Sequence, residues 1–192
     1  KVIEALGLNN ANPCQTPALT TPLGRDIFGD PFSGEFNYAS IVGMLMYLAN
    51  NTRPDIAFAT NQCARYTHNP TTLHASYLKR IGRYLKGTSC NGIILDPSPS
   101  KQLALECYVD ADFAGLHGRE HPDDRNSIKS RLGYIITFGG IPLIWKSQLI
   151  SEICNSTLHA EYVALANALR TLILKYYFGA TTEAQTWCML SK

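Results

Sequence analysis

The sequence predicts an α/β protein in which a helical N-terminal region precedes a mixed β-sheet with one packed helix. Three observations favour this fold class. Apolar residues recur at helical spacing up to about residue 86, segments of β character joined by a Gly-Gly turn follow residue 100, and a capped helical pattern follows residue 155. The turn-rich stretch 90–100 is the expected domain boundary. A chain of 192 residues with 45% hydrophobic residues can bury a substantial core.

Residues 1–35 are expected to form an extended leader that lies as a strap over a neighbouring surface. Pro13, Pro17, Pro22 and Pro31 interrupt any helical pattern there, and Gly, Asn and Thr are frequent. The chain begins with Lys rather than Met and shows no signal-peptide pattern, so we expect a fragment or a trimmed chain.

Two helices are expected between this leader and residue 70. Ile41, Leu45 and Leu48 recur at helical spacing within the stretch 36–50, which predicts a largely buried helix. Pro54 suits the first turn of a second helix, because its missing N–H costs nothing there. The Asn-Pro pair at 69–70 is expected to end this helix.

A third helix is expected from about Thr72 to Lys86, with an apolar stripe and a basic row. The stripe consists of Leu78, Ile81 and Leu85. The basic row consists of Lys79, Arg80, Arg83 and Lys86. A solvated face is one interpretation of this row, since amphipathic helices commonly have one. A face that contacts phosphates is the other, because no acidic residue between Asp55 and Asp96 compensates the charge.

The second half of the chain has β character. Strands are expected at 103–113, 131–138 and 141–146. The Gly-Gly pair at 139–140 predicts a hairpin turn between the last two strands. A further short strand at 149–154 is one possibility. A helix capped by Asn155 or Ser156 and ending near Leu174 follows.

Composition excludes several classes of protein. No run of 18 apolar residues exists, so we expect no membrane span and no membrane partner. The six cysteines form no C-x-x-C pair, which favours free thiols in a reducing, intracellular compartment over a zinc ribbon. A net charge of +2 does not by itself indicate a nucleic-acid-binding protein.

Two carboxylates occupy positions that suit metal-assisted hydrolysis. Asp110 lies in the middle of a predicted strand, and Glu161 lies in the first turns of the last helix. Two-metal nucleases need hard oxygen ligands from different elements of the fold. The alternative is an ordinary edge-strand acid at 110 and a helix N-terminal acid at 161 that stabilises the dipole. Asp112 shares a strand face with Asp110, whereas Asp123 and Asp124 are expected to be solvated loop acids.

Seven segments carry a family resemblance, in one order along most of the chain. They are YASIVGMLMYL at 38–48, TRPDIAF at 52–58, LKRIGRYLKGT at 78–88, YVDADFAG at 108–115, KSRLGY at 129–134, WKS at 145–147 and STLHAEYVAL at 156–165. Together they resemble the C-terminal part of the Pol polyprotein of copia-type LTR retrotransposons.

The resemblance implies a division of the chain into two known modules. Residues 36–95 look like the thumb and connection region of a reverse transcriptase. Residues 103–175 look like the start of a ribonuclease H domain, an incomplete mixed sheet with a packed helix, and 176–192 are a divergent tail. The Tyr-x-Asp-Asp turn of the family's polymerase does not occur, so we expect no polymerase activity.

The resemblance also implies roles for the acids and the basic row. Asp110 and Glu161 correspond to two acidic ligands of a two-magnesium site, while His159 stands where the family often has another Glu. After Glu161 the only acid is Glu183, which does not resemble the family's third acid. The basic row Lys79, Arg80, Arg83 and Lys86 would contact the backbone of an RNA–DNA hybrid.

We therefore expect a fragment of a copia-type reverse transcriptase/ribonuclease H that is catalytically inactive and at most binds nucleic acid, such as an RNA–DNA hybrid, weakly. A residual magnesium-dependent, hybrid-specific ribonuclease H is one alternative. A domesticated, non-catalytic interaction module is the other. The sequence does not fix the oligomeric state.

Overall fold

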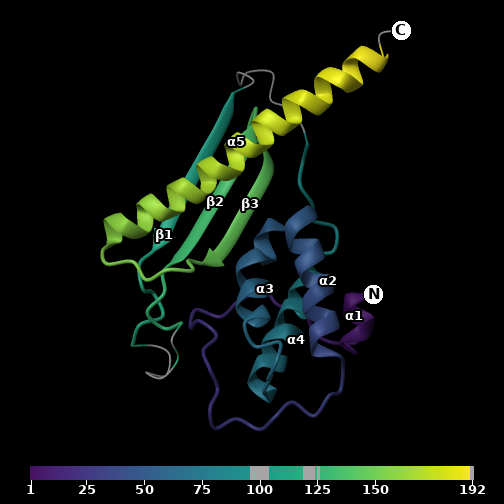
Figure 1. Ribbon diagram of the computed structural model, residues 1–192. Helices are drawn as coiled ribbons and strands as arrows, with labels where there is room; N and C mark the ends of the chain where they lie inside the picture. The colour runs from purple at the N-terminus through teal and green to yellow at the C-terminus, as the bar shows by residue number, and fades with distance from the viewer. Residues whose placement is uncertain (96–103, 119–123, 125, 191–192) are drawn as a thin grey trace.

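The computed structural model describes residues 1–95, 104–118, 124 and 126–190. Its elements are α1 (Val2–Ala5), α2 (Tyr38–Asn51), the 3₁₀ turn η1 (Pro54–Ile56), α3 (Ala57–Ala64), α4 (Thr72–Gly87), β1 (Leu105–Asp112), β2 (Arg131–Phe138), β3 (Ile141–Leu149) and α5 (Thr157–Leu190). Figure 1 shows a helical body, residues 1–95, beside a sheet layer, the described residues from 104 onward, in which α5 crosses one face of the sheet. The predicted α/β class with a helical N-terminal region is confirmed.

The helices of the body begin where local capping allows. Asn37 caps α2 by accepting a hydrogen bond from the Ser40 amide at 2.9 Å, and α2 agrees with the predicted helix to within two residues. Thr71 and His74 form a capping box at the start of α4, in which the Thr71 amide donates to His74 Nδ1 at 2.9 Å. The predicted second helix is divided into η1 and α3, which ends at Ala64.

The core of the helical body draws on every helix and on the leader. Ile41 and Leu45 of α2 and Leu78 and Ile81 of α4 are buried at its centre. The leader adds three buried leucines, Leu6, Leu8 and Leu23. Its first residues form the short helix α1, where the sequence predicted an extended chain. The leader is therefore part of the core at its anchors, in addition to crossing the surface.

The three described strands form an antiparallel sheet in the order β1-β2-β3, where a mixed sheet was expected. Gly139 and Gly140 both have positive φ values, 57° and 82°, as a two-residue hairpin turn requires, so the predicted hairpin is confirmed. β3 continues to Leu149 instead of ending at residue 146, and residues 150–154 form no strand. The predicted start of the first strand at 103 lies outside the described residues.

Helix α5 packs on the sheet through small side chains. Ala160, Ala164 and Ala168 are fully buried, one helical turn apart, against Leu132 and Ile136 of β2. Alanine lets the helix approach the sheet closely. Ser156 caps the helix, accepting from the His159 amide at 3.1 Å, as one of the two predicted caps. The helix runs on to Leu190, past the predicted end near residue 174.

The two regions meet along β3 and the loop before β2. Trp145 Nε1 donates to the Ala49 carbonyl at 2.5 Å. Asp124 is buried and pairs with Arg65 of the helical body at 3.4 Å. The prediction of a solvated acid at 124 is therefore wrong, because a helix distant in the sequence supplies a cation; Asp123 lies outside the described residues. Across the described part of the chain, no helix meets the length and apolarity needed for a membrane span.

Candidate functional site

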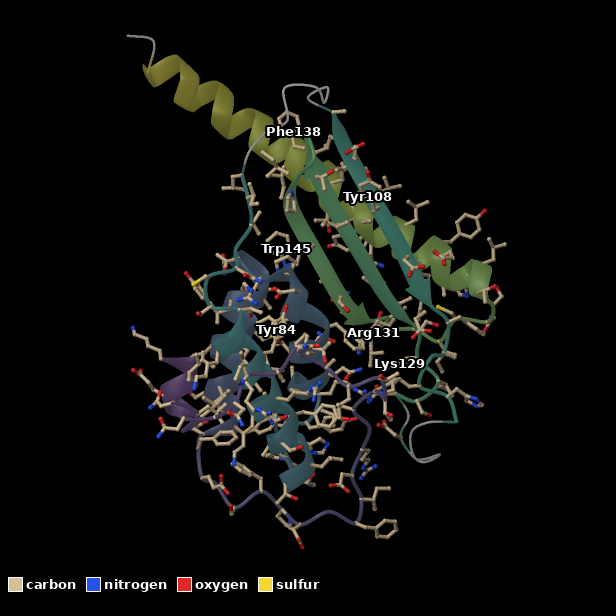
Figure 2. All side chains as sticks on the ribbon, turned by 180° about the vertical axis from the view of Figure 1, so that it is seen from behind. Tyr84, Tyr108, Lys129, Arg131, Phe138 and Trp145 are labelled. Atoms are coloured by element: carbon tan, nitrogen blue, oxygen red, sulfur yellow. The ribbon has the colours of Figure 1, made fainter. Side chains whose placement is uncertain are left out.

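The side chains of β1 alternate between two faces of the sheet. Cys107, Val109 and Ala111 pack against the buried cluster under α5. Tyr108 and Asp110, with the opposite parity, therefore belong to the other face, which we call the open face. Figure 2 views the sheet from this side, with Tyr108 on β1 and Trp145 near the helical body. Asp112 shares the open face with Asp110, as predicted.

The strand register groups side chains into rows on the open face. Tyr108 lies opposite Ile135, which lies opposite Trp145, and these three form an apolar row. Asp110 lies opposite Gly133, which lies opposite Ser147. The rows line a cavity of about 360 Å³, whose other wall is Pro54, Ala57 and Phe58 of the helical body. Asp110 thus brings a carboxylate to a mainly apolar hollow between the two regions.

The two predicted metal ligands belong to different layers. Asp110 is exposed on the open face, whereas Glu161 is exposed on α5, which covers the opposite face. Among the described residues, no group of three or more His, Cys, Asp or Glu side chains could hold a metal ion. Two-magnesium sites depend on several carboxylates gathered around the ions, so these residues do not fit such a site.

The Asp112 carboxylate lies against the turn that follows β1. A Cβ atom built on Gly115 would lie 1.9 Å from Asp112 Oδ2, so the carboxylate occupies the space that a side chain at 115 would need. Ala114 in this turn has a φ of 47°, a left-handed conformation that is costly for residues other than glycine. The Asp112 carboxylate and this strained residue therefore lie in the same tight turn.

The basic row of α4 faces the leader. Its hydrogen bonds run from Lys79 Nζ to Glu35 (2.6 Å), from Arg80 Nη2 to Thr16 Oγ1 (2.7 Å), from Arg83 Nε to the Asn12 carbonyl (2.6 Å), and from Lys86 Nζ to the carbonyls of Asn9 (2.5 Å) and Ala11 (2.9 Å). The expectation that no acid compensates this row is wrong at Lys79, because Glu35 reaches it from the leader. The row is half-buried and differs from the solvated face that was one interpretation.

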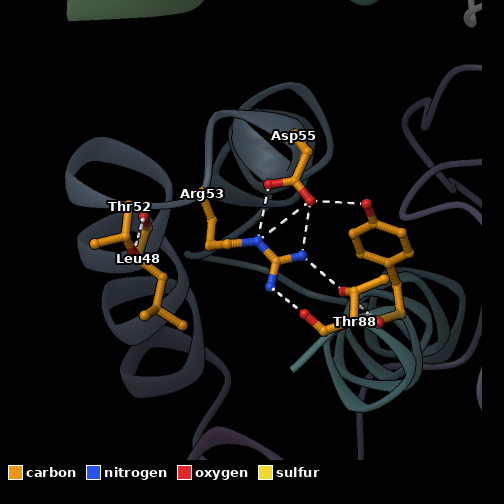
Figure 3. A network of polar contacts seen from close by, with 6 residues as sticks. Leu48, Thr52, Arg53, Asp55 and Thr88 are labelled. Carbon is orange, nitrogen blue, oxygen red and sulfur yellow. Dashed lines mark hydrogen bonds and ion pairs between the residues drawn. The ribbon is translucent and has the colours of Figure 1, made fainter. Parts of the chain in front are cut away.

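An unpredicted polar network connects η1 to the end of α4 (Figure 3). The buried Arg53 guanidinium pairs with Asp55 at 2.7 Å and donates to the carbonyl and hydroxyl of Thr88 at 3.0 and 2.7 Å. Tyr84 donates to Asp55 at 2.7 Å. Burial alone would raise the pKa of Asp55, but the hydrogen bonds from Arg53 and Tyr84 outweigh it and lower that pKa. The Arg-Pro-Asp sequence indicates only the ion pair between Arg53 and Asp55. No nearby sequence pattern indicates the hydrogen bonds from Arg53 to Thr88.

Comparison with known proteins finds relatives over most of the chain. The retrovirus-related Pol polyprotein from transposon RE1 of Arabidopsis thaliana is 38% identical over 169 residues, which are 86% of this chain and 11% of that protein. The corresponding polyprotein from transposon TNT 1-94 of Nicotiana tabacum is 34% identical over 179 residues, 90% of this chain and 13% of that protein. The chain thus spans about a tenth of the length of these relatives.

A shorter relative also matches most of the chain. Secreted RxLR effector protein 161 of Plasmopara viticola is 32% identical over 136 residues, which are 71% of this chain and 89% of that protein. No protein-family model and no solved structure matches the chain.

Proposed function

Because the chain belongs to the retrovirus-related Pol polyproteins of copia-type transposons, we propose that it is a reverse transcriptase/ribonuclease H fragment that binds the backbone of an RNA–DNA hybrid weakly and does not cleave it. Its helical body corresponds to the thumb and connection region, and its sheet layer to the start of the ribonuclease H domain.

The basic row of α4 is the observation that carries the binding part of this proposal. In the described structure, Arg80, Arg83 and Lys86 donate to neutral oxygens, so these contacts leave their positive charge uncompensated. Cations spaced along one side of a helix suit the phosphates of a nucleic-acid backbone, which binds through charge and without sequence preference.

The carboxylates support the second part, the absence of cleavage. Asp110 and Glu161 stand in different layers, and no third acid joins them among the described residues. Without several converging carboxylates, magnesium lacks the ligands that hold it for phosphodiester hydrolysis. We therefore assign no catalytic step to either residue and regard both as ancestral.

Binding is tested by fluorescence anisotropy with a labelled RNA–DNA hybrid over a series of salt concentrations. Replacing Arg83 and Lys86 together by Gln should weaken binding and reduce the slope of log affinity against log salt by about two. Arg170→Gln, an exposed arginine on α5, removes a similar charge elsewhere and should leave the slope unchanged. Equal affinities for the double variant and the wild type would contradict the proposed interface.

Cleavage is tested separately, with magnesium and the same hybrid. We expect no product from the wild type. Cleavage that is lost in Asp110→Asn would overturn this expectation and establish the alternative, a residual magnesium-dependent ribonuclease H.

A second candidate function is a non-catalytic interaction module without a role in nucleic-acid binding. One observation favours it: the similar segment makes up 89% of the secreted effector protein and therefore occurs outside a polyprotein. Hybrid binding that is undetectable or insensitive to salt would favour this candidate over the first.

A further inference from the structure

We propose that leader residues Asn9–Thr16, the strap, are a displaceable cover of the basic row on α4, and that nucleic-acid phosphates compete with the strap for its cations. This inference rests on the proposed function, since it assumes that the row meets phosphates. It adds that the free protein holds its nucleic-acid-binding face partly closed.

The strap supplies the acceptors that the cations use now. Arg83 binds the Asn12 carbonyl, Lys86 binds the carbonyls of Asn9 and Ala11, and Arg80 binds the Thr16 hydroxyl. These acceptors are neutral, whereas phosphate oxygens are charged. A negatively charged phosphate adds a Coulomb attraction to the hydrogen bond of each cation, which a neutral carbonyl or hydroxyl does not provide. A phosphate backbone therefore offers each cation a better acceptor than the strap does.

The strap can open without unfolding the core. Its flanks are anchored by the buried side chains of Leu8 on one side and Leu23 on the other. Between these anchors the residues are exposed or half-buried, and the strap packs against the core through one small side chain, that of Ala11. Segments with few buried apolar contacts open locally at a small fraction of the global free energy of unfolding.

Two glycines of α4 make room for the leader. A Cβ atom on Gly82 would lie 2.6 and 2.7 Å from the methyl groups of Leu6 and Leu8, and a Cβ atom on Gly87 would lie 2.9 Å from Pro13 Cβ. Glycine is a poor helix former, so its presence at these contacts is explained by the close approach of the leader. Only the Gly87 contact involves the strap itself. A side chain at 87 should therefore push the strap away without removing a cation or a core contact.

Gly87→Leu in the full chain tests the inference with the labelled RNA–DNA hybrid. We expect the variant to bind the hybrid about three- to tenfold more tightly than the wild type, the equivalent of about one net hydrogen bond to the strap. Gly43→Leu is the matched control, since nothing lies within 4 Å of a Cβ atom at that α2 glycine. Its affinity should equal that of the wild type. Unchanged or weaker binding by Gly87→Leu, beside loss of binding in the Arg83 and Lys86 double variant, would overturn the strap inference and leave the proposed interface standing.

Hydrogen exchange of the wild type gives a second test that needs no variant. The Ala11 amide, which donates to the Leu8 carbonyl at 3.1 Å, should exchange faster when the hybrid is bound than when the protein is free, because phosphates release the strap. Slower or unchanged exchange of this amide, at hybrid concentrations that saturate binding, would overturn the inference. If the Arg83 and Lys86 double variant binds the hybrid as well as the wild type does, the proposed interface itself is contradicted. Failure of the proposed interface can therefore be told apart from failure of the strap inference alone.

Discussion

The helical body and the sheet layer bury their apolar side chains in different ways. The body surrounds a core that contains Leu45, Leu78 and Ile81, each at most 1% exposed, and the leader closes it from outside. The sheet layer buries one face of the sheet under the alanines of α5. The outer side of α5 carries a row of exposed apolar side chains, Leu158, Tyr162, Leu165, Leu169 and Ile173.

This difference shows that a region can form its helices and strands without enclosing all of its apolar side chains. Both regions form the strands and helices that their sequence periods predict. In the helical body each helix has neighbours on several sides, so large side chains are enclosed. In the described sheet layer a single helix covers a single face, and apolar side chains on the open face and on the outside of α5 stay in contact with water. Truncating a large buried side chain of the body should therefore cost more stability than truncating an apolar side chain on the outside of α5.

Truncation of Leu78 tests this contrast with the largest expected effect. Leu78→Ala should lower the free energy of unfolding by about 2–5 kcal/mol, because it leaves a cavity in a closely packed core. Leu73→Ala, on the same helix but 43% exposed, and Leu165→Ala on α5, 42% exposed, should each cost about 1 kcal/mol or less. Urea unfolding curves measure all three. An equal loss of unfolding free energy in Leu165→Ala and Leu78→Ala would contradict this contrast, because it would show that the outer side of α5 is buried.

Loss of the Arg53 network should have the next largest effect and should be confined to the body. Arg53→Met removes charged hydrogen bonds to Asp55 and Thr88, for an expected cost of about 2–3 kcal/mol. Hydrogen exchange should speed up in α4 and leave β2 and β3 unaffected. Lys79→Met, which breaks a more exposed ion pair, is the control, with an expected cost below about 1 kcal/mol. Equal loss of protection in both regions would show that they unfold together.

Acidification should produce the smallest effect, again through the body. Burial lowers the pKa of His74 below its ordinary value of 6.5, although the Gly24 carbonyl and Asp26 oppose this shift. The unfolded chain then binds a proton at a higher pH than the folded protein does, so stability falls as the pH drops below about 6.5. Urea midpoints across this range should decline in the wild type and less steeply in His74→Gln. Parallel declines would show that other groups cause the loss.

Local patterns were sufficient for most elements of the fold. The period of Ile41 and Leu45, the position of Pro54 in the first turn of η1 and the Gly139-Gly140 turn each act over a few residues, and the structure contains the corresponding elements. The predicted ends of helices and strands were less accurate where contacts with other elements determine them. β3 extends to Leu149 because it pairs with β2 along its whole length, which no local pattern indicates.

Contacts between distant residues account for what the sequence did not reveal. Asp124 looked like a loop acid because its partner Arg65 lies 59 positions earlier. Glu35, 44 positions earlier in the chain, compensates the charge of Lys79, and the neutral acceptors of Arg83 and Lys86 also belong to the leader, so no pattern within α4 indicates these contacts. Asp110 was predicted as a strand acid, and the structure places it on such a strand. The pairing of β1 with β2 determines which residues lie beside Asp110 on its face of the sheet.

The two-glycine turn between β2 and β3 also has a consequence for the order of folding. Only two residues separate these strands, so their pairing closes a very short loop, whereas pairing of β1 with β2 must first close the connection 113–130. Closing short loops costs less chain entropy, and hairpins form within about 1–10 μs. We expect the β2–β3 hairpin to form early and β1, which carries Asp110, to join it later. Pulse-labelling hydrogen exchange should detect protection of β2–β3 amides before that of β1, and simultaneous protection would contradict this order.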